Sequence, residues 1–238
     1  MIDNGVGHAL CISVTLPDFP QVLALAENNQ NFFASVGVHP DYEDTPEPSV
    51  AQLVELAQHS KVIAIGETGL DYFRLKGDLE WQRERFRTHI RAARQVQLPL
   101  VIHTRSASND TIAILKEEGE QGGVGSAGGV FHCFTETLEV ARQALDLGFY
   151  ISFSGILTFK SAADLREVAK FVPEDRFLIE TDSPYLAPVP YRGKTNNPSY
   201  VPFVAKQLAE LRGCSAQQIG EQTTANFHRL FVRTVRPS

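Results

Sequence analysis

The feature that most constrains the fold of this sequence is a series of short apolar segments separated by helical patterns. Seven such segments lie about 28 residues apart on average, beginning at residues 8, 31, 61, 97, 128, 148 and 176. Most are continuously apolar, which is typical of strands buried on both faces of a parallel sheet. The segments between them carry apolar residues at helical spacing, as in residues 19–26. This order predicts an α/β protein built from repeated strand and helix units.

The spacing of the units favours a closed barrel of eight parallel strands, a fold of typically about 250 residues. The chain has 238 residues and seven predicted strands, and it begins almost directly in the first of them. We therefore predict a (β/α)8 TIM-type barrel whose first strand, together with its helix, is absent from this chain. An open doubly wound sheet is the alternative, and it would need no missing strand. Because no linker divides the sequence, we expect residues 1–238 to form one domain.

Composition excludes several classes of protein. Hydrophobic residues make up 43% of the chain and the formal charge is −6, which argues against a disordered chain and against broad electrostatic binding of nucleic acid. A local phosphate site built from a metal or a few arginines remains open. The three cysteines form no Cys-x-x-Cys pair, so we expect a cytoplasmic protein without a thiolate zinc site. No segment resembles a membrane span or a signal peptide, and none indicates an obligate protein partner.

Four of the apolar segments end in a side chain that binds metals, namely Glu67, His103, His132 and Asp182. In a barrel of parallel strands the carboxyl ends meet at one face, so these side chains are expected in one mouth. Near the last of them, Glu180 and Asp182 alternate along the strand, and we favour Asp182 as the ligand. Imidazoles and carboxylates without a thiolate suit zinc, manganese or a similar divalent ion. Metal-activated hydrolysis is the natural use of such a centre.

Other polar residues fall near the same strand ends. His39 follows a strand in the motif GVHPD, where it would meet a substrate. Several cations have a similar placement and modestly favour a phosphorylated substrate, because arginine forks match phosphate oxygens: Arg74, Arg105, Arg192 and Lys194. By contrast, three histidines lie in helical patterns and are interpreted as surface or packing residues: His59, His89 and His228.

Six motifs lie within residues 37–198: GVHPD, GETGLDYF, PLVIHTR, GGVFHCF, YISFSGILTFK and ETDSPYLAPVPYRGKTNNP. Together they resemble the motifs of the TatD family of metal-dependent deoxyribonucleases. The resemblance implies an amidohydrolase-type (β/α)8 barrel with one or two zinc, magnesium or manganese ions. It implies hydrolysis of phosphodiester bonds in DNA, as a 3′ to 5′ exonuclease acting on single strands or 3′ ends.

The resemblance also implies roles for individual residues. Glu67 is similar to the family's ligand that bridges two metals, and His103 and His132 to the histidines of one site. Asp182 is similar to the aspartate of the other site, which orients or deprotonates the attacking water. On this basis Glu67 and Asp182 are the expected catalytic residues. The positions at which family members line the substrate cleft correspond to His39, Arg105 and Tyr185.

One family feature does not occur in this sequence. Family members begin with a strand that carries His-x-His, and this pattern is found nowhere in the 238 residues. The missing ligands coincide with the missing strand, and a start codon placed too far downstream or a shortened chain would explain both. We therefore expect one bound ion or none, and impaired nuclease activity. The alternatives are another amidohydrolase-like hydrolase, acting on an ester, amide or D-aminoacyl bond, and a non-catalytic barrel protein.

Overall fold

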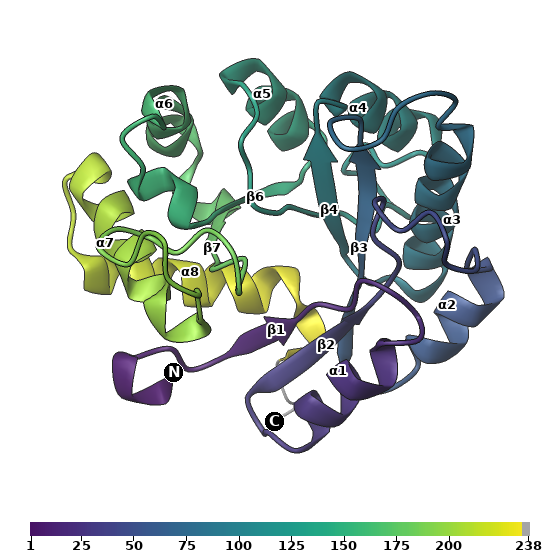
Figure 1. Ribbon diagram of the computed structural model, residues 1–238, viewed down its shortest axis with the longest axis horizontal. Coiled ribbons are helices and arrows are strands. Elements are labelled where there is room, and N and C mark those ends of the chain that lie inside the picture. Colours follow the sequence, from purple (N-terminus) through teal and green to yellow (C-terminus); the bar gives the residue numbers. More distant parts are fainter. Residues whose placement is uncertain (235–238) are drawn as a thin grey trace.

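A computed structural model describes residues 1–234 of the chain. Within them, seven parallel strands form one sheet in the order β1 to β7 (Figure 1). Strand order that follows the sequence excludes the doubly wound alternative, in which the order reverses within the sheet. Each predicted apolar segment contains one strand: β1 Ala9–Cys11, β2 Phe32–Val36, β3 Val62–Asp71, β4 Leu100–Arg105, β5 Gly129–Phe131, β6 Tyr150–Phe153 and β7 Phe177–Ile179.

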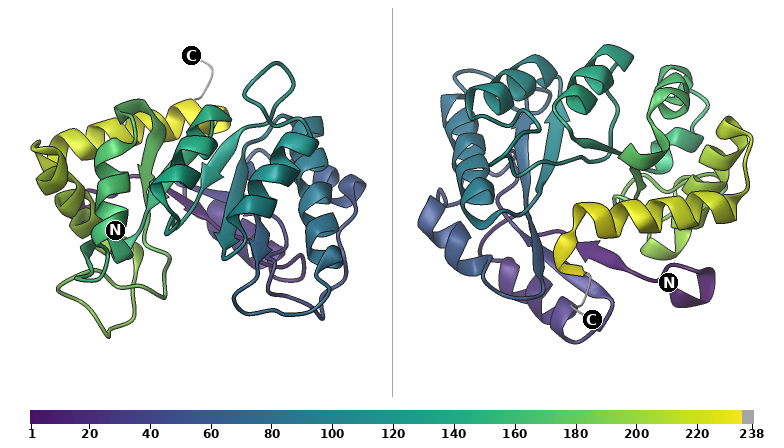
Figure 2. Two further views of the ribbon diagram at one scale, coloured as in Figure 1. Left: turned by 90° about the horizontal axis from the view of Figure 1, so that it is seen from above. Right: turned by 180° about the vertical axis from the view of Figure 1, so that it is seen from behind.

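Helices alternate with these strands, as a barrel of strand and helix units requires. The sheet curls, and the helices cover its outer side (Figures 1 and 2). β1 and β7 are the outermost strands of the sheet. The α-helices of the described residues are α1 Phe19–Glu27, α2 Val50–Leu56, α3 Glu80–Val96, α4 Ser108–Glu117, α5 Leu138–Asp146, α6 Ala163–Phe171, α7 Val201–Arg212 and α8 Ala216–Leu230.

Local sequence explains where several helices begin. Ser49 and Ser215 cap α2 and α8, and in each case the glutamine three residues later completes a capping box. Asp18 precedes α1 and Ala162 precedes α6, and neither residue gives its helix a side-chain cap. Ser161 therefore gives no side-chain cap to α6.

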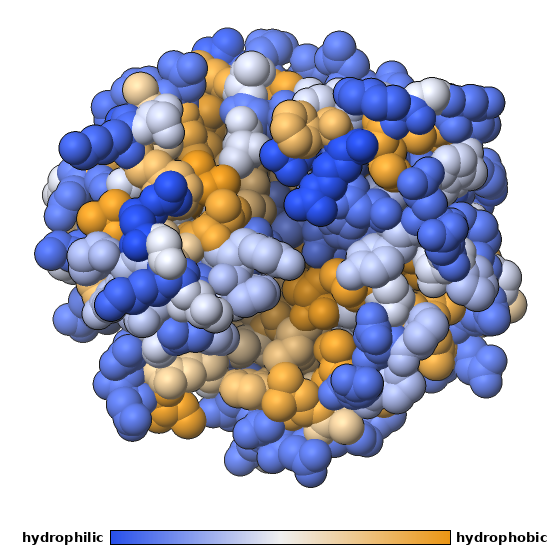
Figure 3. Space-filling model, in the orientation of Figure 1, coloured by the Kyte–Doolittle hydropathy of each residue, from blue (hydrophilic) through white to orange (hydrophobic). Residues whose placement is uncertain are grey.

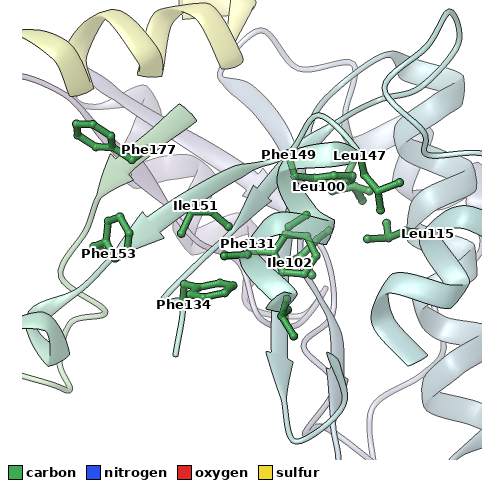
Figure 4. Packing of buried hydrophobic residues seen from close by; sticks show 14 of the residues in the cluster. Leu100, Ile102, Leu115, Phe131, Phe134, Leu147, Phe149, Ile151, Phe153 and Phe177 are labelled. Atoms are coloured by element: carbon green, nitrogen blue, oxygen red, sulfur yellow. The ribbon is translucent and has the colours of Figure 1, made fainter. Parts of the chain in front are cut away.

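Two apolar clusters hold the fold together. The larger one lies between the sheet and the outer helices; Figure 4 shows Phe131 and Phe149 close together there, with Leu115 of α4 nearby. The smaller one gathers Ile63, Val101 and other strand residues against Phe231, which follows α8. These clusters bury both faces of the strands, which explains why the apolar segments are continuous instead of alternating.

The segment after α8 closes the amino-terminal end of the sheet. Arg233 donates hydrogen bonds to the carbonyl oxygens of Ala57, which follows α2, and Val62, the first residue of β3. The opposite end of the strands, where the polar side chains lie, is not covered by this segment. In the orientation of Figure 1 the surface is hollowed near its centre, where hydrophilic and hydrophobic residues meet (Figure 3).

The helices of residues 1–234 include none that is both long enough and apolar enough to cross a membrane.

Helix α3 buries a histidine that the sequence pattern does not single out. His89 is completely buried, accepts a hydrogen bond from the backbone N–H of Val38 at 3.0 Å, and contacts the carbonyl oxygen of Arg85 at 2.7 Å. Of the two interpretations of His89, as a surface or a packing residue, the structure therefore supports packing, and it adds two hydrogen bonds that the sequence pattern does not predict. Because the two ring nitrogens serve one acceptor and one donor role, the buried ring is neutral.

We expect His89 to make folding sensitive to acid. Burial lowers the pKa of His89 from its ordinary value of 6.5 to about 4. The unfolded chain therefore takes up this proton at a higher pH than the folded chain, and stability falls as the pH decreases from about 6.5 to about 4. The loss over this window is on the order of 3 kcal/mol. Urea unfolding at several pH values measures this loss. The dependence of the unfolding free energy on pH should become weaker in His89→Gln but not in the partly exposed control His59→Gln. Equal slopes in wild type and His89→Gln would contradict it.

Candidate metal centre

The centre of the site is Glu67, in the interior of β3. The sequence pattern places Glu67 at the end of a strand, but β3 continues to Asp71. The pairing of β3 with β4 shifts between Ile65 and Thr68, so Glu67 lies at an irregularity of the strand. Its backbone N–H donates to the carbonyl oxygen of Ser13, in the segment after β1. The backbone of Glu67 is thus held by the segment after β1, and its side chain is buried.

A glycine lets β3 and β4 approach closely beside this carboxylate. Gly69 has a φ of +129°, and a Cβ atom there would lie 2.0 Å from the carbonyl oxygen of His103. Neither the conformation nor the contact suits any residue with a side chain. This approach brings His103 of β4 next to the carboxyl-terminal half of β3.

Three imidazoles converge on one oxygen of Glu67. Its Oε1 lies 2.6 Å from Nε2 of His132, 3.1 Å from Nε2 of His39 and 3.4 Å from Nδ1 of His103. The histidines come from three separate segments, those that follow or contain β2, β4 and β5. The structure therefore brings together Glu67, His103 and His132 as the sequence predicts, and adds His39 to the same group.

Two further carboxylates orient two of these rings. Nε2 of His103 lies 3.0 Å from Oδ2 of Asp71, and Nδ1 of His132 lies 3.2 Å from Oε1 of Glu180. A ring nitrogen that donates to a carboxylate leaves the other nitrogen as the one with a lone pair. In both rings that other nitrogen faces Glu67, which is the arrangement found around metal-binding histidines.

His39 has a different arrangement. Its Nδ1 accepts a hydrogen bond from the backbone N–H of Asp41 at 3.1 Å. The neutral ring then carries its proton on Nε2, the atom that faces Glu67. His39 is therefore set up as a hydrogen-bond donor, and it lacks the orienting acceptor that His103 and His132 have.

The cluster shifts the pKa values of its members strongly. Burial alone would raise the pKa of Glu67, but the charge of His132 and hydrogen bonds from the three imidazoles hold it well below its ordinary value. Burial alone would likewise raise the pKa of Asp71, but mainly its bond with His103 holds that pKa at about 2. Against the effect of burial, Glu67 and Glu180 raise the pKa of His132 well above its ordinary value. Glu67 and Asp71 therefore remain ionised, as metal-binding or orienting carboxylates must.

Asp182 lies beside this group, three residues after β7 ends. One ligand atom from each of His132, Glu180 and Asp182 falls within a cluster whose atoms are all within 4.8 Å of one another. A second cluster of the same size joins His39, Glu67 and His103. Burial raises the pKa of Asp182 above its ordinary value. In this respect Asp182 differs from Glu67, whose pKa lies below its ordinary value in spite of burial. The predicted ligands thus share one site, with Asp182 on the side of His132.

The predicted substrate residues lie less close together. The guanidinium of Arg105 stacks on the exposed ring of Phe73 at 3.9 Å. Tyr185 is 70% exposed. Among the other cations, Arg74 pairs with Asp41 and Arg192 stacks on Phe159. These side chains offer charge and aromatic surface, but they do not gather into one cluster. His39 differs from them, because it contacts Glu67.

The strand pattern does not predict the role of Asp71, and it left Glu180 as the less favoured carboxylate. A signal for Asp71 is present, because it is four residues after Glu67 and alternation along a strand places both on the same face. A strand that ends at Glu67, as the apolar pattern predicts, does not include Asp71 and so does not reveal this relation.

The donor set fits a divalent ion, since it combines two partly buried imidazoles, His103 and His132, each oriented by a carboxylate, with a central ionised carboxylate. Comparison with known proteins supports this reading. The family model described as TatD related DNase matches residues 1–232. This chain belongs to the TatD family. Among its TatD-family relatives, the metal-dependent hydrolase YcfH of Escherichia coli is 47% identical over 95% of this chain and 83% of its own.

Two other proteins to which this chain is similar are a solved structure and a relative whose name states an activity. The crystal structure of YjjV, a TatD homologue from Escherichia coli, superposes with a TM-score of 0.86 at 31% identity, covering 96% of this chain and 88% of that one. A Klebsiella pneumoniae protein named 3′-5′ ssDNA/RNA exonuclease TatD is 32% identical over 95% of this chain and 87% of its own. The chain is thus a metal-dependent hydrolase of the TatD family with the barrel architecture of these relatives.

Proposed function

We propose that this metal-dependent hydrolase cleaves phosphodiester bonds of single-stranded DNA, proceeding from the 3′ end. The observation that carries the proposal is the buried carboxylate of Glu67 at the meeting point of three imidazoles. The name of the Klebsiella relative supports a nucleic-acid substrate. Exposed arginine and aromatic side chains around the centre, such as Arg105 on Phe73, suit the phosphates and bases of a single strand.

The residues that would hold an ion are Glu67, Nδ1 of His103 and Nε2 of His132, and Asp182 lies beside His132. Zinc, magnesium or manganese would supply a Lewis acid and a water activated for attack on phosphorus. Glu67 and the orienting pair Asp71 and Glu180 keep the two imidazoles in the orientation that binding requires.

The chain's own residues provide the remaining steps. Asp182 accepts a proton from the attacking water, and burial, which raises its pKa, makes it a stronger base than an exposed aspartate. His39 donates from Nε2 to an oxygen of the scissile phosphate, for which its hydrogen bond from Asp41 orients it. Arg105 and Tyr185 bind the neighbouring phosphate and base.

We expect the 238-residue chain to retain at most about one tightly bound ion. Within the described residues the two candidate ligand groups are His39, Glu67 and His103, and His132, Glu180 and Asp182. An ion that draws His132 to Glu67 and His103, which it already faces, leaves only Glu180 and Asp182 of the second group for another ion. Elemental analysis by mass spectrometry after dialysis against metal-free buffer checks the count. Two ions per chain would show that further ligands complete the second set.

Digestion of end-labelled oligonucleotides tests the proposed reaction. With Mg²⁺, Mn²⁺ or Zn²⁺ added, single-stranded DNA with a 5′ label should shorten stepwise, whereas a 3′-phosphorothioate end should block digestion. A panel of small esters, lactones and N-acyl amino acids is assayed in parallel. Activity on that panel without DNA cleavage would overturn the proposal in favour of another amidohydrolase-like reaction. Inactivity on all substrates with metal bound would favour a non-catalytic barrel.

A further inference from the structure

Helix α3 carries a stripe of polar side chains that are buried but lie outside the metal centre. Gln82, Arg85 and His89 are 0%, 2% and 0% exposed. Their spacing of three and four residues places them on one face of the helix. Burying amide, guanidinium and imidazole groups costs free energy unless each finds a partner. The hydrogen-bond partners of these three side chains therefore indicate what the stripe does.

The three side chains hold the backbone of three consecutive residues. Nε2 of His89 accepts from the N–H of Val38 at 3.0 Å. Nη1 of Arg85 donates to the carbonyl oxygen of His39 at 3.0 Å. Nε2 of Gln82 donates to the carbonyl oxygen of Pro40 at 3.2 Å. The middle residue of the three is the histidine that faces Glu67.

Two of these side chains also connect the His39 segment to neighbouring structure. Arg85 donates to the carbonyl oxygen of Tyr42 and forms a bidentate pair with Glu47. Gln82 accepts from the N–H of Asp71 at 2.9 Å through its Oε1, beside the carboxylate that orients His103. The stripe therefore joins the segment after β2 to the end of β3.

A stripe that served packing alone would be apolar, because aliphatic side chains fill such a face without any need for partners. Here the polar atoms are directed at backbone groups of residues 38–42 and 71, apart from Nδ1 of His89, which contacts the carbonyl oxygen of Arg85, and Nε and Nη2 of Arg85, which pair with the carboxylate of Glu47. A loop held at three successive residues has little freedom to move its central side chain, and a misplacement of about 1 Å costs on the order of 100-fold in rate.

We propose that Gln82, Arg85 and His89 are positioning residues, which fix the backbone of residues 38–40 so that the His39 ring is held against Glu67. They touch neither the substrate nor the ion. The consequence for catalysis rests on the function proposed above, whereas the consequence for the backbone does not.

The experiment compares Arg85→Met with Arg91→Met, a matched change on the exposed side of the same helix, where Arg91 pairs with Glu84 and Glu118. Hydrogen exchange followed by mass spectrometry should show faster exchange in residues 36–42 for Arg85→Met alone. Titration with Co²⁺, followed by its visible absorption, should give nearly the same affinity in both variants, because Glu67, His103 and His132 are unchanged.

Activity on single-stranded DNA supplies the third measurement. Arg85→Met should lower kcat by about 10-fold to 100-fold, while the same change in a His39→Ala background should have little further effect. Additive losses in the double variant would overturn the proposal, as would unaltered exchange in residues 36–42. If the wild type cleaves no DNA, the exchange and Co²⁺ results still decide whether the stripe holds the loop.

A second pair of variants covers the case in which Arg85→Met fails to fold. His89→Gln keeps an acceptor for the N–H of Val38, whereas His89→Leu removes it. The proposal requires faster exchange near Val38 in His89→Leu and partial restoration in His89→Gln. Identical exchange in the two would contradict it.

Discussion

Replacing Glu67 with glutamine is expected to abolish metal binding at neutral pH, with a loss of affinity of at least about 100-fold. All three imidazoles face this carboxylate, and its pKa is held well below the ordinary value, so it is ionised at neutral pH. An amide of the same shape offers a neutral oxygen and turns a donor toward the rings. Isothermal titration with Zn²⁺ or Mn²⁺ measures the loss, and hydrolytic activity should fall with it.

Glu120 provides a matched control, because it is also a completely buried glutamate. Its oxygens accept from the N–H groups of Ala127 and Gly128, just before β5 begins, at the opposite end of that strand from His132. Glu120→Gln should therefore bind metal like the wild type, even if it unfolds more easily. Undiminished affinity in Glu67→Gln would remove Glu67 from the ligand set.

Replacing Asp182 with asparagine is expected to lower kcat by roughly 100-fold to 10,000-fold while changing metal affinity much less. The asparagine cannot accept the proton that the attacking water must lose. Glu67, His103 and His132 stay in place to hold the ion. Steady-state kinetics on a labelled oligonucleotide, together with a metal titration of the same preparation, separates the two effects.

Asp175→Asn is the control for this variant, since Asp175 is an aspartate at the other end of β7, where it pairs with Arg176. Its activity should equal that of the wild type. Should Asp182→Asn lose metal and activity in the same proportion, Asp182 would act as a ligand and not as the proton acceptor.

Most of the fold is predictable from the sequence because each buried strand is a continuous apolar segment. All seven predicted strands are confirmed, and the sequential strand order follows from their spacing. The end of β3 is not predictable in this way. Gly66 and Gly69 interrupt the apolar pattern, and the strand persists only because these glycines allow β4 to approach, which is a tertiary effect.

The candidate site is predictable where a side chain follows an apolar segment directly, as His103 and His132 do. Asp71 and His89 are harder to predict, since their roles depend on partners 32 and 51 residues away. A helical histidine among charged residues looks exposed in the sequence. Only the packing of α3 against the segment after β2 shows that His89 is buried and that its ring nitrogens are used.

The segment that closes the amino-terminal end of the sheet has a consequence for how the chain folds. Arg233 binds carbonyl oxygens of residues 171 and 176 positions earlier, and Phe231 completes the inner apolar cluster with strand residues. A ribosome must therefore release residues up to about 233 before this cluster is complete. Contacts of such long range also slow folding, because loop closure precedes any gain from packing. Until then, the inner faces of the strands remain exposed to chaperones and to other chains.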